Sequence, residues 1–428
     1  MRAGAILPAL AALVVFLVLI GLYYLGRPDL YDLMLRGWGI LPFRSPFLDT
    51  AGGLAAWDCT RLGFDVIEAD PCDPMNRSYN YSPFWMDLAF VPLRGADRTA
   101  VGIATGVLFV LGLALLPAVR GAGDMALMCL ACVSTMPLFA MDRGNPDIFL
   151  LLLGMGVVGL IRRGTVARLV AYAVVWFMIA VKYYPAAFFV LALRERLRVL
   201  LALALASVVF GVLFVGHYYT NMMRAMAELP QGSYDSVFFG ARNVPFYLAR
   251  GVMEATGDAA SAAILTVLVQ VALILFIWRR ARRWMGDGPF RTGLARLDEW
   301  AWLLLVSNAA ILVFCFFAGH NIGYRGIFLL PVLPAFLLLA RLAPERALLW
   351  RASAWLVVFI LWGEAIRNAI GRLGLAGPVE FAARNLFWTA REAAWWWVMA
   401  LLVTVLLDFI ARSRAWRELT GQGRVPNA

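Results

Sequence analysis

Histidine, lysine and cysteine are scarce in this chain. Its 428 residues include two histidines, five cysteines and a single lysine, Lys182. The one Cys-x-x-Cys pair, Cys129 to Cys132, has no second pair to complete a tetrahedral zinc site. We therefore expect no metal and no other cofactor, and we interpret Cys129, Cys132 and Cys315 as apolar packing residues.

Charged residues are also few. They make up 15% of the chain, against about 25% in an ordinary soluble domain. Hydrophobic residues make up 62%, and the mean hydropathy is +0.77. Apolar stretches of about 17–22 residues recur, which is the length needed to cross the hydrocarbon core of a bilayer. These values exclude a soluble globular protein and indicate a multi-pass membrane protein.

The net charge of +11 does not indicate a nucleic-acid partner, because the arginines lie in short runs between apolar stretches. Such runs mark the cytoplasmic ends of membrane helices and contact anionic headgroups. They place residues 119–123, 162–168, 194–198, 279–298, 342–351 and the C-terminus in the cytoplasm.

The apolar pattern predicts an all-α, single membrane domain over residues 1–428 with about twelve transmembrane helices. The first is read as a retained helix, because it is too long for a cleaved signal peptide. The helices are expected at 5–25, 99–118, 124–141, 146–161, 166–181, 184–194, 198–216, 259–278, 299–318, 325–341, 349–367 and 393–411.

Two long extracytoplasmic loops follow from this topology, at 26–98 and 217–258. The alternation of sides requires that Pro83–Leu93 does not cross. That segment is too short to span, and Asp87 interrupts it, so an interfacial helix is expected. If it did cross, the count would become thirteen and the charge pattern would fail on one side. Shorter outer loops are expected at 142–146, 182–183, 319–324 and 368–392.

The loop at 26–98 is rich in acidic residues and holds Cys59 and Cys72. In an oxidising compartment these cysteines are a natural disulfide. Its loop length corresponds to about 3 kcal/mol in the chain-entropy model. A disulfide here would hold the acidic loop over the membrane surface.

Three polar segments lie where helices are expected to leave the outer side of the membrane. They are 47–66, 141–147 and 319–328. A charged side chain at a helix centre costs about 2.5–3.5 kcal/mol, so a cluster of such groups is paired, solvated in a cavity or functional.

Each segment also has a purely structural interpretation. Asp142-Arg143 suits a helix-end ion pair, and Asn145-Pro146 suits a turn that opens the next helix. Asp49 suits an N-cap for residues 50–62. Aromatic residues such as Tyr79 and Tyr81 suit an interfacial belt. Arg325 fits a structural role less well, because a basic residue at a helix start opposes the helix dipole.

A series of short motifs follows the first helix in a fixed order. They are Asp49, Gly63-Phe64-Asp65, Asp73-Pro74, Asn80-Tyr81-Ser82-Pro83, Arg143-Gly144-Asn145, Lys182-Tyr183-Tyr184-Pro185 and Asn321 to Tyr324-Arg325. Taken together, these motifs and their order resemble the GT-C superfamily of polytopic glycosyltransferases, closest to glycosyltransferase family 87 and its uncharacterised bacterial relatives. The resemblance covers roughly residues 1–345. One departure is Val66, where these loops often have tyrosine.

The resemblance implies an inverting, metal-independent glycosyltransferase. It would move a hexose or pentose, with mannose among the candidates, from a polyprenyl-phosphate donor to a lipid-linked or cell-envelope glycan acceptor. One carboxylate would act as general base, with Asp49 preferred and Asp58 as its rival. Donor phosphate would contact Arg325, Arg143 and Lys182. Sugar or acceptor contacts would come from Asn80, Tyr81, Asn145, His320, Asn321 and Tyr324.

The resemblance also implies a bacterial inner membrane with the active site on its extracytoplasmic face. Two other classes compete with a transferase. One is a transporter or flippase of a lipid-linked or envelope substrate, although no repeat relates the two halves of the chain. The other is a scaffold that keeps the fold without catalysis. The outer loop at 217–258, which contains Arg242, is a further candidate for acceptor binding.

Overall fold

The computed structural model describes residues 3–43, 45–227, 238–319 and 321–421. Helices dominate, because apolar chain in a bilayer must satisfy its backbone hydrogen bonds internally. Labels with η mark 3₁₀ helices. Up to residue 227 the elements are α1 (Ala3–Tyr24), α2 (Pro28–Gly37), α3 (Leu48–Arg61), α4 (Phe84–Asp87), η1 (Leu88–Phe90), η2 (Gly95–Asp97), α5 (Arg98–Leu113), α6 (Ala122–Cys132), α7 (Thr135–Arg143), α8 (Asp147–Ile161), α9 (Thr165–Val181), η3 (Tyr184–Arg194) and α10 (Leu197–Ala227).

The remaining elements include two short strands that pair antiparallel, with Phe238 opposite Ile322 and Phe239 opposite Asn321. This ladder ties the start of α11 to the end of α14. The elements are β1 (Phe238–Phe239), α11 (Asn243–Thr256), α12 (Ala259–Met285), α13 (Gly288–Ala295), α14 (Glu299–Ala318), β2 (Asn321–Ile322), η4 (Gly323–Leu329), α15 (Val332–Leu342), η5 (Pro344–Arg346), α16 (Ala347–Leu361), α17 (Gly363–Gly371), α18 (Gly377–Arg412) and α19 (Arg414–Leu419).

Every predicted membrane segment coincides with a helix, which confirms an all-α polytopic membrane protein. In the part of the chain that the structure describes, eight helices are long and apolar enough to cross a bilayer, or nine if the bent pair α16–α17 is one span. Three of the twelve predicted segments are shorter apolar helices, namely α8, α9 and η3.

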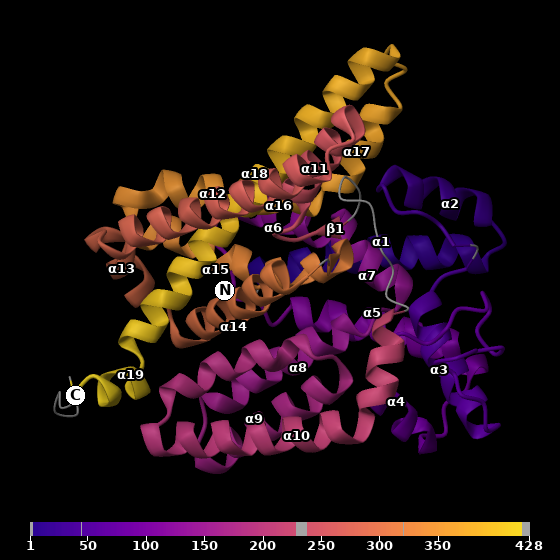
Figure 1. Ribbon diagram of the computed structural model, residues 1–428, viewed down its shortest axis with the longest axis horizontal. Helices are drawn as coiled ribbons and strands as arrows, with labels where there is room; N and C mark the ends of the chain where they lie inside the picture. The colour runs from indigo at the N-terminus through magenta and orange to yellow at the C-terminus, as the bar shows by residue number, and fades with distance from the viewer. Residues whose placement is uncertain (1–2, 44, 228–237, 320, 422–428) are drawn as a thin grey trace.

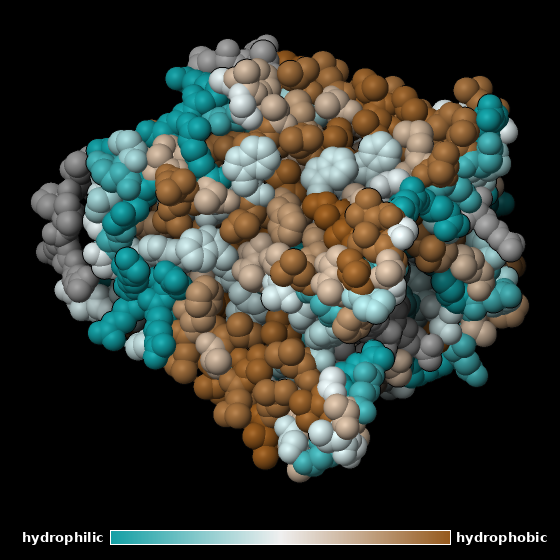
Figure 2. Space-filling view, turned by 90° about the horizontal axis from the view of Figure 1, so that it is seen from above, coloured by the Kyte–Doolittle hydropathy of each residue, from teal (hydrophilic) through white to brown (hydrophobic). Residues whose placement is uncertain are grey.

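Burial separates central helices from peripheral ones. In the most apolar 18-residue stretch of α14, 72% of the residues are buried inside the protein, and in that of η4–α15, 78% are buried. In α10 and α12 the corresponding share is only 11%. Helix α14 packs against η3, α8, α15 and α18. Figure 1 shows α8, α9 and α10 side by side, with α18 running diagonally across the molecule. Figure 2 shows broad apolar areas on one face, with hydrophilic residues gathered toward its edges. Helices α10 and α12 therefore offer most of their surface to lipid.

The helix predicted over 198–216 continues to Ala227 as α10, into the predicted outer loop. The extension packs on the loop at 26–98: Arg224 pairs with Asp65 at 2.8 Å, and Tyr218 donates to Asp87. The hydrogen bond from Arg224 holds the pKa of Asp65 below its usual range. Hydropathy ends the apolar run earlier, but these contacts keep the chain helical.

The helix predicted over 393–411 begins sixteen residues earlier, because α18 starts at Gly377. The added turns are polar, which is why hydropathy missed them. Glu380 and Arg384 pair across one turn at 2.6 Å. Arg391, which is 3% exposed, pairs with Glu364 of α17 at 2.7 Å. The predicted outer loop at 368–392 is therefore largely helical.

Inside the loop at 26–98, α3 is anchored at both ends. A disulfide joins Cys59, near the helix end, to Cys72, as the sequence predicted. At its start, Phe47 has φ 62° and is fully buried. The backbone N–H of Phe47 donates to the carbonyl of Asp142 at 2.6 Å, which joins α3 to the end of α7.

Segment Pro83–Leu93 forms only α4 and η1, of four and three residues. Such short helices are unable to cross a bilayer. This segment is not among the helices that are long and apolar enough to span, which favours the predicted arrangement in which it does not cross. The Trp57 indole N–H donates to the carbonyl of Trp85 at 2.6 Å, so the segment rests against α3.

Reducing the disulfide should lower the thermal unfolding midpoint of the purified protein. Opening the Cys59–Cys72 loop restores chain entropy to the unfolded state, at a cost of about 3 kcal/mol in the chain-entropy model. The measurement is the midpoint in detergent with and without a thiol reductant. The Cys59→Ser/Cys72→Ser variant is the control, because its midpoint should not respond to reductant. A wild-type midpoint that stays constant while thiol labelling reports a broken bond would contradict the prediction.

Candidate functional site

A cavity of about 700 Å³ forms where segments from distant parts of the chain meet. It lies against the loop at 70–82, both strands and the ends of several helices, among them α3, α7, α10 and α14. The residues that line it include Asp49, Gly52, Asp70, Asp73, Arg77, Asn80, Tyr81, Phe43, Phe139, Arg143, Lys182, Tyr183, Tyr184, Ala225, Met226, Phe238, Arg242, Phe314, Cys315, Ala318, Gly319, Asn321, Ile322, Tyr324 and Arg325.

Asp49 lies in the first turn of α3 and is half-buried. Asn145 donates from its side-chain amide to a carboxylate oxygen of Asp49 at 2.6 Å. The N-cap of α3 is Phe47, so the interpretation of Asp49 as the N-cap is wrong. The helix presents this carboxylate to the cavity, and its second oxygen has no partner among the described residues.

Asn145 connects Asp49 to the start of α8. Its side-chain carbonyl accepts from the backbone N–H of Asp147 at 2.9 Å, which closes the expected turn before the helix. Asn145 is fully buried, so both ends of its amide are held by protein. The orientation of Asp49 therefore depends on where α8 begins.

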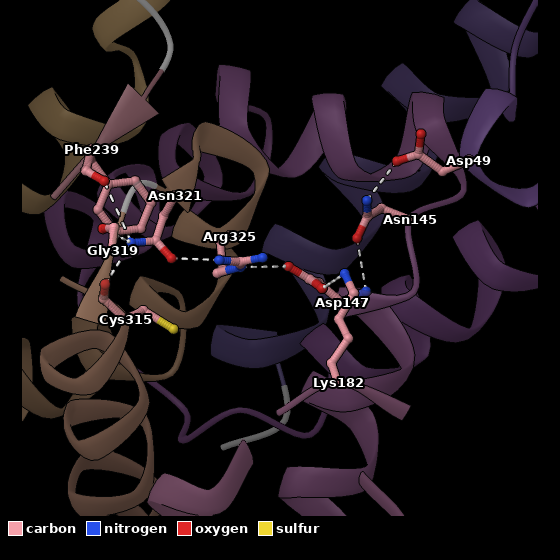
Figure 3. Close-up of polar contacts among 9 residues, drawn as sticks. All are labelled: Asp49, Asn145, Asp147, Lys182, Phe239, Cys315, Gly319, Asn321 and Arg325. Carbon is pink, nitrogen blue, oxygen red and sulfur yellow. Dashed lines mark hydrogen bonds and ion pairs between the residues drawn. The ribbon is translucent and has the colours of Figure 1, made fainter. Parts of the chain in front are cut away.

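Asp147 is the centre of the charged cluster. It is fully buried and pairs with Lys182, which is 8% exposed, and with Arg325 through Nε at 3.3 Å. Lys182 comes from the junction of α9 and η3, and Arg325 from η4. Two cations thus share one carboxylate, and the cluster keeps an excess of one positive charge beside the cavity (Figure 3).

Asn321 fixes the far side of Arg325. Its side-chain oxygen accepts from the guanidinium, while its amide donates to the carbonyls of Cys315 at 2.6 Å and Gly319 at 2.9 Å. A longer bond of 3.5 Å reaches Phe239 on β1. The strand pair and the end of α14 therefore hold Arg325 in place, as Figure 3 shows.

Aromatic rings surround the two cations. Lys182 Nζ lies 5.0 Å from the ring centre of Tyr81 and 5.9 Å from that of Tyr324, and Arg325 lies 4.8 Å from Tyr184. Burial raises the pKa of Tyr81 well above its usual range, so this phenol keeps its proton. The rings supply stacking faces and neutral hydroxyls for a polar ligand.

The loop at 70–82 contributes another part of the lining and is tied back to α3. Asp73 pairs with Arg77 at 2.8 Å, and Arg77 also donates to the carbonyl of Leu48 at 3.2 Å. A side chain at Gly52 would collide with both Arg77 and Asp73, so the loop approaches α3 closely there. Burial raises the pKa of Asp70 in the same loop.

Asp58 lies elsewhere. Its carboxylate pairs with Arg61 at 3.0 Å and accepts from the backbone N–H of Gly95 at 2.7 Å. It is not among the residues that line the cavity. One of its oxygens holds α3 against η2 and the other pairs within α3, so geometry favours Asp49 over Asp58 as the cavity carboxylate.

Most predicted site residues meet at this cavity. Asp142 and Arg143 do not form the expected ion pair in the described residues: Asp142 accepts from Tyr31, and Arg143 lies over the Phe43 ring. His320 falls outside the described residues. The predicted residues that line the cavity or bond to its lining are Asp49, Asn80, Tyr81, Arg143, Asn145, Lys182, Asn321, Tyr324 and Arg325.

The sequence did not single out Asp147 as a partner for Lys182 and Arg325. The feature of the sequence that could have pointed to Asp147 is its position two residues after the Arg143-Gly144-Asn145 motif. Arg77 was also missed, and Asp73 was matched only as part of the Asp73-Pro74 motif, with no role at the site. Among the described residues, the one group with metal-ligand spacing is Cys59, Asp70 and Cys72. Its two sulfurs are joined in the disulfide and are not available as thiolates.

Replacing Gly144 by alanine should destabilise the protein and disturb the site. Gly144 has φ 57°, a left-handed conformation that costs a side-chain-bearing residue about 1–2 kcal/mol. A β-carbon there would also overlap the Thr50 hydroxyl, which donates to the Gly144 carbonyl at 2.8 Å. The measurement is the thermal midpoint of the purified variant. Gly53→Ala in α3 is the matched control, because its added methyl group meets no atom within 4 Å. Equal midpoints for the two variants would refute this account of Gly144.

The cavity combines an amide-held carboxylate, a buried cluster with excess positive charge, and aromatic faces. This set suits a polar, anionic ligand that carries hydroxyl groups. Met226, Phe314 and Ala318 add an apolar part to the lining. No protein-family model, curated protein or solved structure matches the chain. The functional proposal therefore depends on these side chains and their geometry.

Proposed function

We propose that this protein is a membrane glycosyltransferase that moves a sugar from a polyprenyl-phosphate donor to a lipid-linked or envelope glycan acceptor. The observation that carries the proposal is the arrangement around Asn145. A carboxylate, Asp49, and a cationic cluster, Lys182 and Arg325 on Asp147, face one cavity and are joined through a single buried amide. General base and phosphate cradle are the two parts that such a transfer requires.

Asp49 would act as the general base. Its Asn145 bond occupies one oxygen, and the other is free to accept the proton of an acceptor hydroxyl. The acceptor oxygen attacks the anomeric carbon as the bond from that carbon to the phosphate oxygen breaks. The proton goes to Asp49, the electron pair of the broken bond goes to the phosphate, and the anomeric configuration inverts. No metal is required for this step.

The leaving group gains one negative charge, as a phosphate diester becomes a monoester. The Asp147 cluster supports this role, because two cations share one carboxylate and one positive charge is left over. A guanidinium grips phosphate oxygens as a fork, and an ammonium acts as a point charge. Because the cluster is buried, its attraction for developing charge is stronger than it would be in water.

The proposal includes a membrane arrangement of about twelve spans. Helices α8, α9 and η3 would complete the set beside the longer helices, with the cavity on the extracytoplasmic side of a bacterial inner membrane. The apolar lining from the ends of α10 and α14 supports passage of a lipid tail, because α10 is largely unburied by protein. The loop at 26–98 would cover the cavity from the aqueous side.

A transporter or flippase is supported less well. Transporters place broken helices at the substrate site. The break between α16 and α17, a bend of 59°, contributes no residue to the lining of the cavity. A scaffold without catalysis would have no need for a buried amide to orient Asp49, or for an excess positive charge beside it.

Asp49→Asn should abolish transfer, because an amide is unable to take the acceptor proton. We expect a loss of at least about 10²-fold in kcat with folding preserved. The measurement is transfer by purified protein from a panel of polyprenyl-phosphate sugars. Asp58→Asn is the matched control, and it should lower stability while keeping transfer. Normal transfer by Asp49→Asn would remove Asp49 from the chemistry.

Arg325→Ala should weaken donor use more than acceptor use, because it removes one of the two cations at the leaving phosphate. A decrease of about 10²–10³-fold in kcat/KM for the donor is expected. Arg325→Lys should lie between this variant and wild type, since it keeps the charge but loses the fork. Steady-state kinetics with each substrate varied in turn measure the difference. A selective rise in the acceptor KM would mean that Arg325 binds the other substrate.

A further inference from the structure

Arg143 is a buried cation without a carboxylate partner in the described residues. It closes α7, is 8% exposed and lines the cavity. Its guanidinium carbon lies 3.8 Å from the ring centre of Phe43 and 5.2 Å from that of Phe139. Within the described part of the chain, its Nε has no hydrogen-bond partner.

Three other cations in the lining have carboxylate partners, and a fourth, Arg242, is exposed rather than buried. Lys182 and Arg325 share Asp147, and Arg77 has Asp73. Asp142, the carboxylate next to Arg143 in the chain, accepts instead from the Tyr31 hydroxyl. Cation–π contacts contribute about 0.5–2 kcal/mol, which is less than the cost of burying an unpaired charge. An anion from outside the chain would complete the site.

Arg143 belongs to the same wall as Asp49. Three hydrogen bonds join the end of α7 to the start of α3: Phe47 N–H to the Asp142 carbonyl at 2.6 Å, Thr50 to the Gly144 carbonyl at 2.8 Å, and Asn145 to Asp49 at 2.6 Å. Asp147 itself begins α8, directly after this turn, but the two cations that pair with it are carried by the α9–η3 junction and by η4. The cavity therefore has two cationic positions supported by different elements.

The Phe139 and Tyr324 rings connect the two positions. Their centres lie 5.5 Å apart. Arg143 lies over Phe139, and Lys182 lies near Tyr324 at 5.9 Å. A sugar that stacked along these rings would have one cation near each end.

The inverting displacement at the anomeric carbon indicates which substrate each of the two cationic positions faces. In an in-line displacement, the attacking hydroxyl and the leaving phosphate lie on opposite sides of the anomeric carbon. The base is on the side of the acceptor, so a cation on the same wall as Asp49 also faces the acceptor. Lys182 and Arg325 then face the leaving phosphate.

We propose that Arg143 binds an anionic group of the acceptor, a phosphate or a carboxylate, at a site separate from the donor phosphate. The Phe43 and Phe139 rings pack against the guanidinium, and its Nε has no hydrogen-bond partner among the described residues. A guanidinium makes a forked contact with an oxyanion. The acceptor is thus an acidic molecule, either a lipid-phosphate-linked saccharide or a glycan with an acidic sugar. This inference rests on the proposed function for the identity of the ligand as acceptor.

A binding experiment tests the second anion site without any transfer. The full chain in detergent is titrated with decyl phosphate, and bound molecules are counted by native mass spectrometry. Wild type should hold two, Arg143→Gln one, and Arg143→Gln/Arg325→Ala only the background level. Arg143→Lys guards against a folding defect and should regain the second molecule. If Arg143→Gln binds as many molecules as wild type, the proposal is overturned.

A kinetic experiment tests the assignment to the acceptor. For an anionic acceptor, Arg143→Gln should raise the acceptor KM about 10–100-fold and leave the donor KM unchanged. A neutral acceptor of the same sugar sequence should show no such rise. Paired phosphate-bearing and carboxylate-bearing acceptors distinguish the two sources of the anion. A rise in the donor KM instead would overturn this inference alone, whereas a wild-type protein that transfers no sugar would overturn the proposed function and leave the binding result standing.

Discussion

The site depends on the neutralisation of Asp147. A fully buried carboxylate without partners would be prohibitively costly, so Lys182 and Arg325 must both reach it. Lys182 ends α9 and Arg325 lies in η4, nearly 150 residues later in the chain. Their meeting fixes where α8 begins and how η4 enters the core. The ion cluster therefore joins the two halves of the protein at the place where the cavity forms.

The remaining features of the cavity follow from the start of α8. Asn145 caps the turn before Asp147 and so points its amide at Asp49. Gly144 allows the left-handed turn that brings α7 against α3. The disulfide and the Asp73–Arg77 pair hold the loop at 70–82 along α3, so this part of the lining is also fixed. Because these links are covalent, buried or half-buried, the carboxylate and the cations keep a defined separation before any ligand binds.

Much of the fold could be predicted from composition, because apolar length determines where membrane helices form. The ends of those helices were predicted less well. Helices α10 and α18 extend through polar turns that ion pairs stabilise, and a hydropathy pattern does not detect such pairs. The order of motifs placed Asp49, Lys182 and Arg325 near one another. It did not reveal that Lys182 and Arg325 both pair with Asp147, or that Asp58 accepts a hydrogen bond from Gly95. Such pairing depends on three-dimensional proximity rather than on spacing in the chain.

The strength of the charge interactions in the cavity depends on the apolar surroundings that its neighbouring helices provide. Helix α10 is mostly unburied by protein, whereas α14 and η4 are central, and all three contribute to the lining of the cavity. Attraction between a guanidinium and an oxyanion is stronger in such partly buried surroundings than in water. The same conditions make an unpaired cation costly. On the function proposed above, binding an acidic acceptor would offset the cost of burying Arg143.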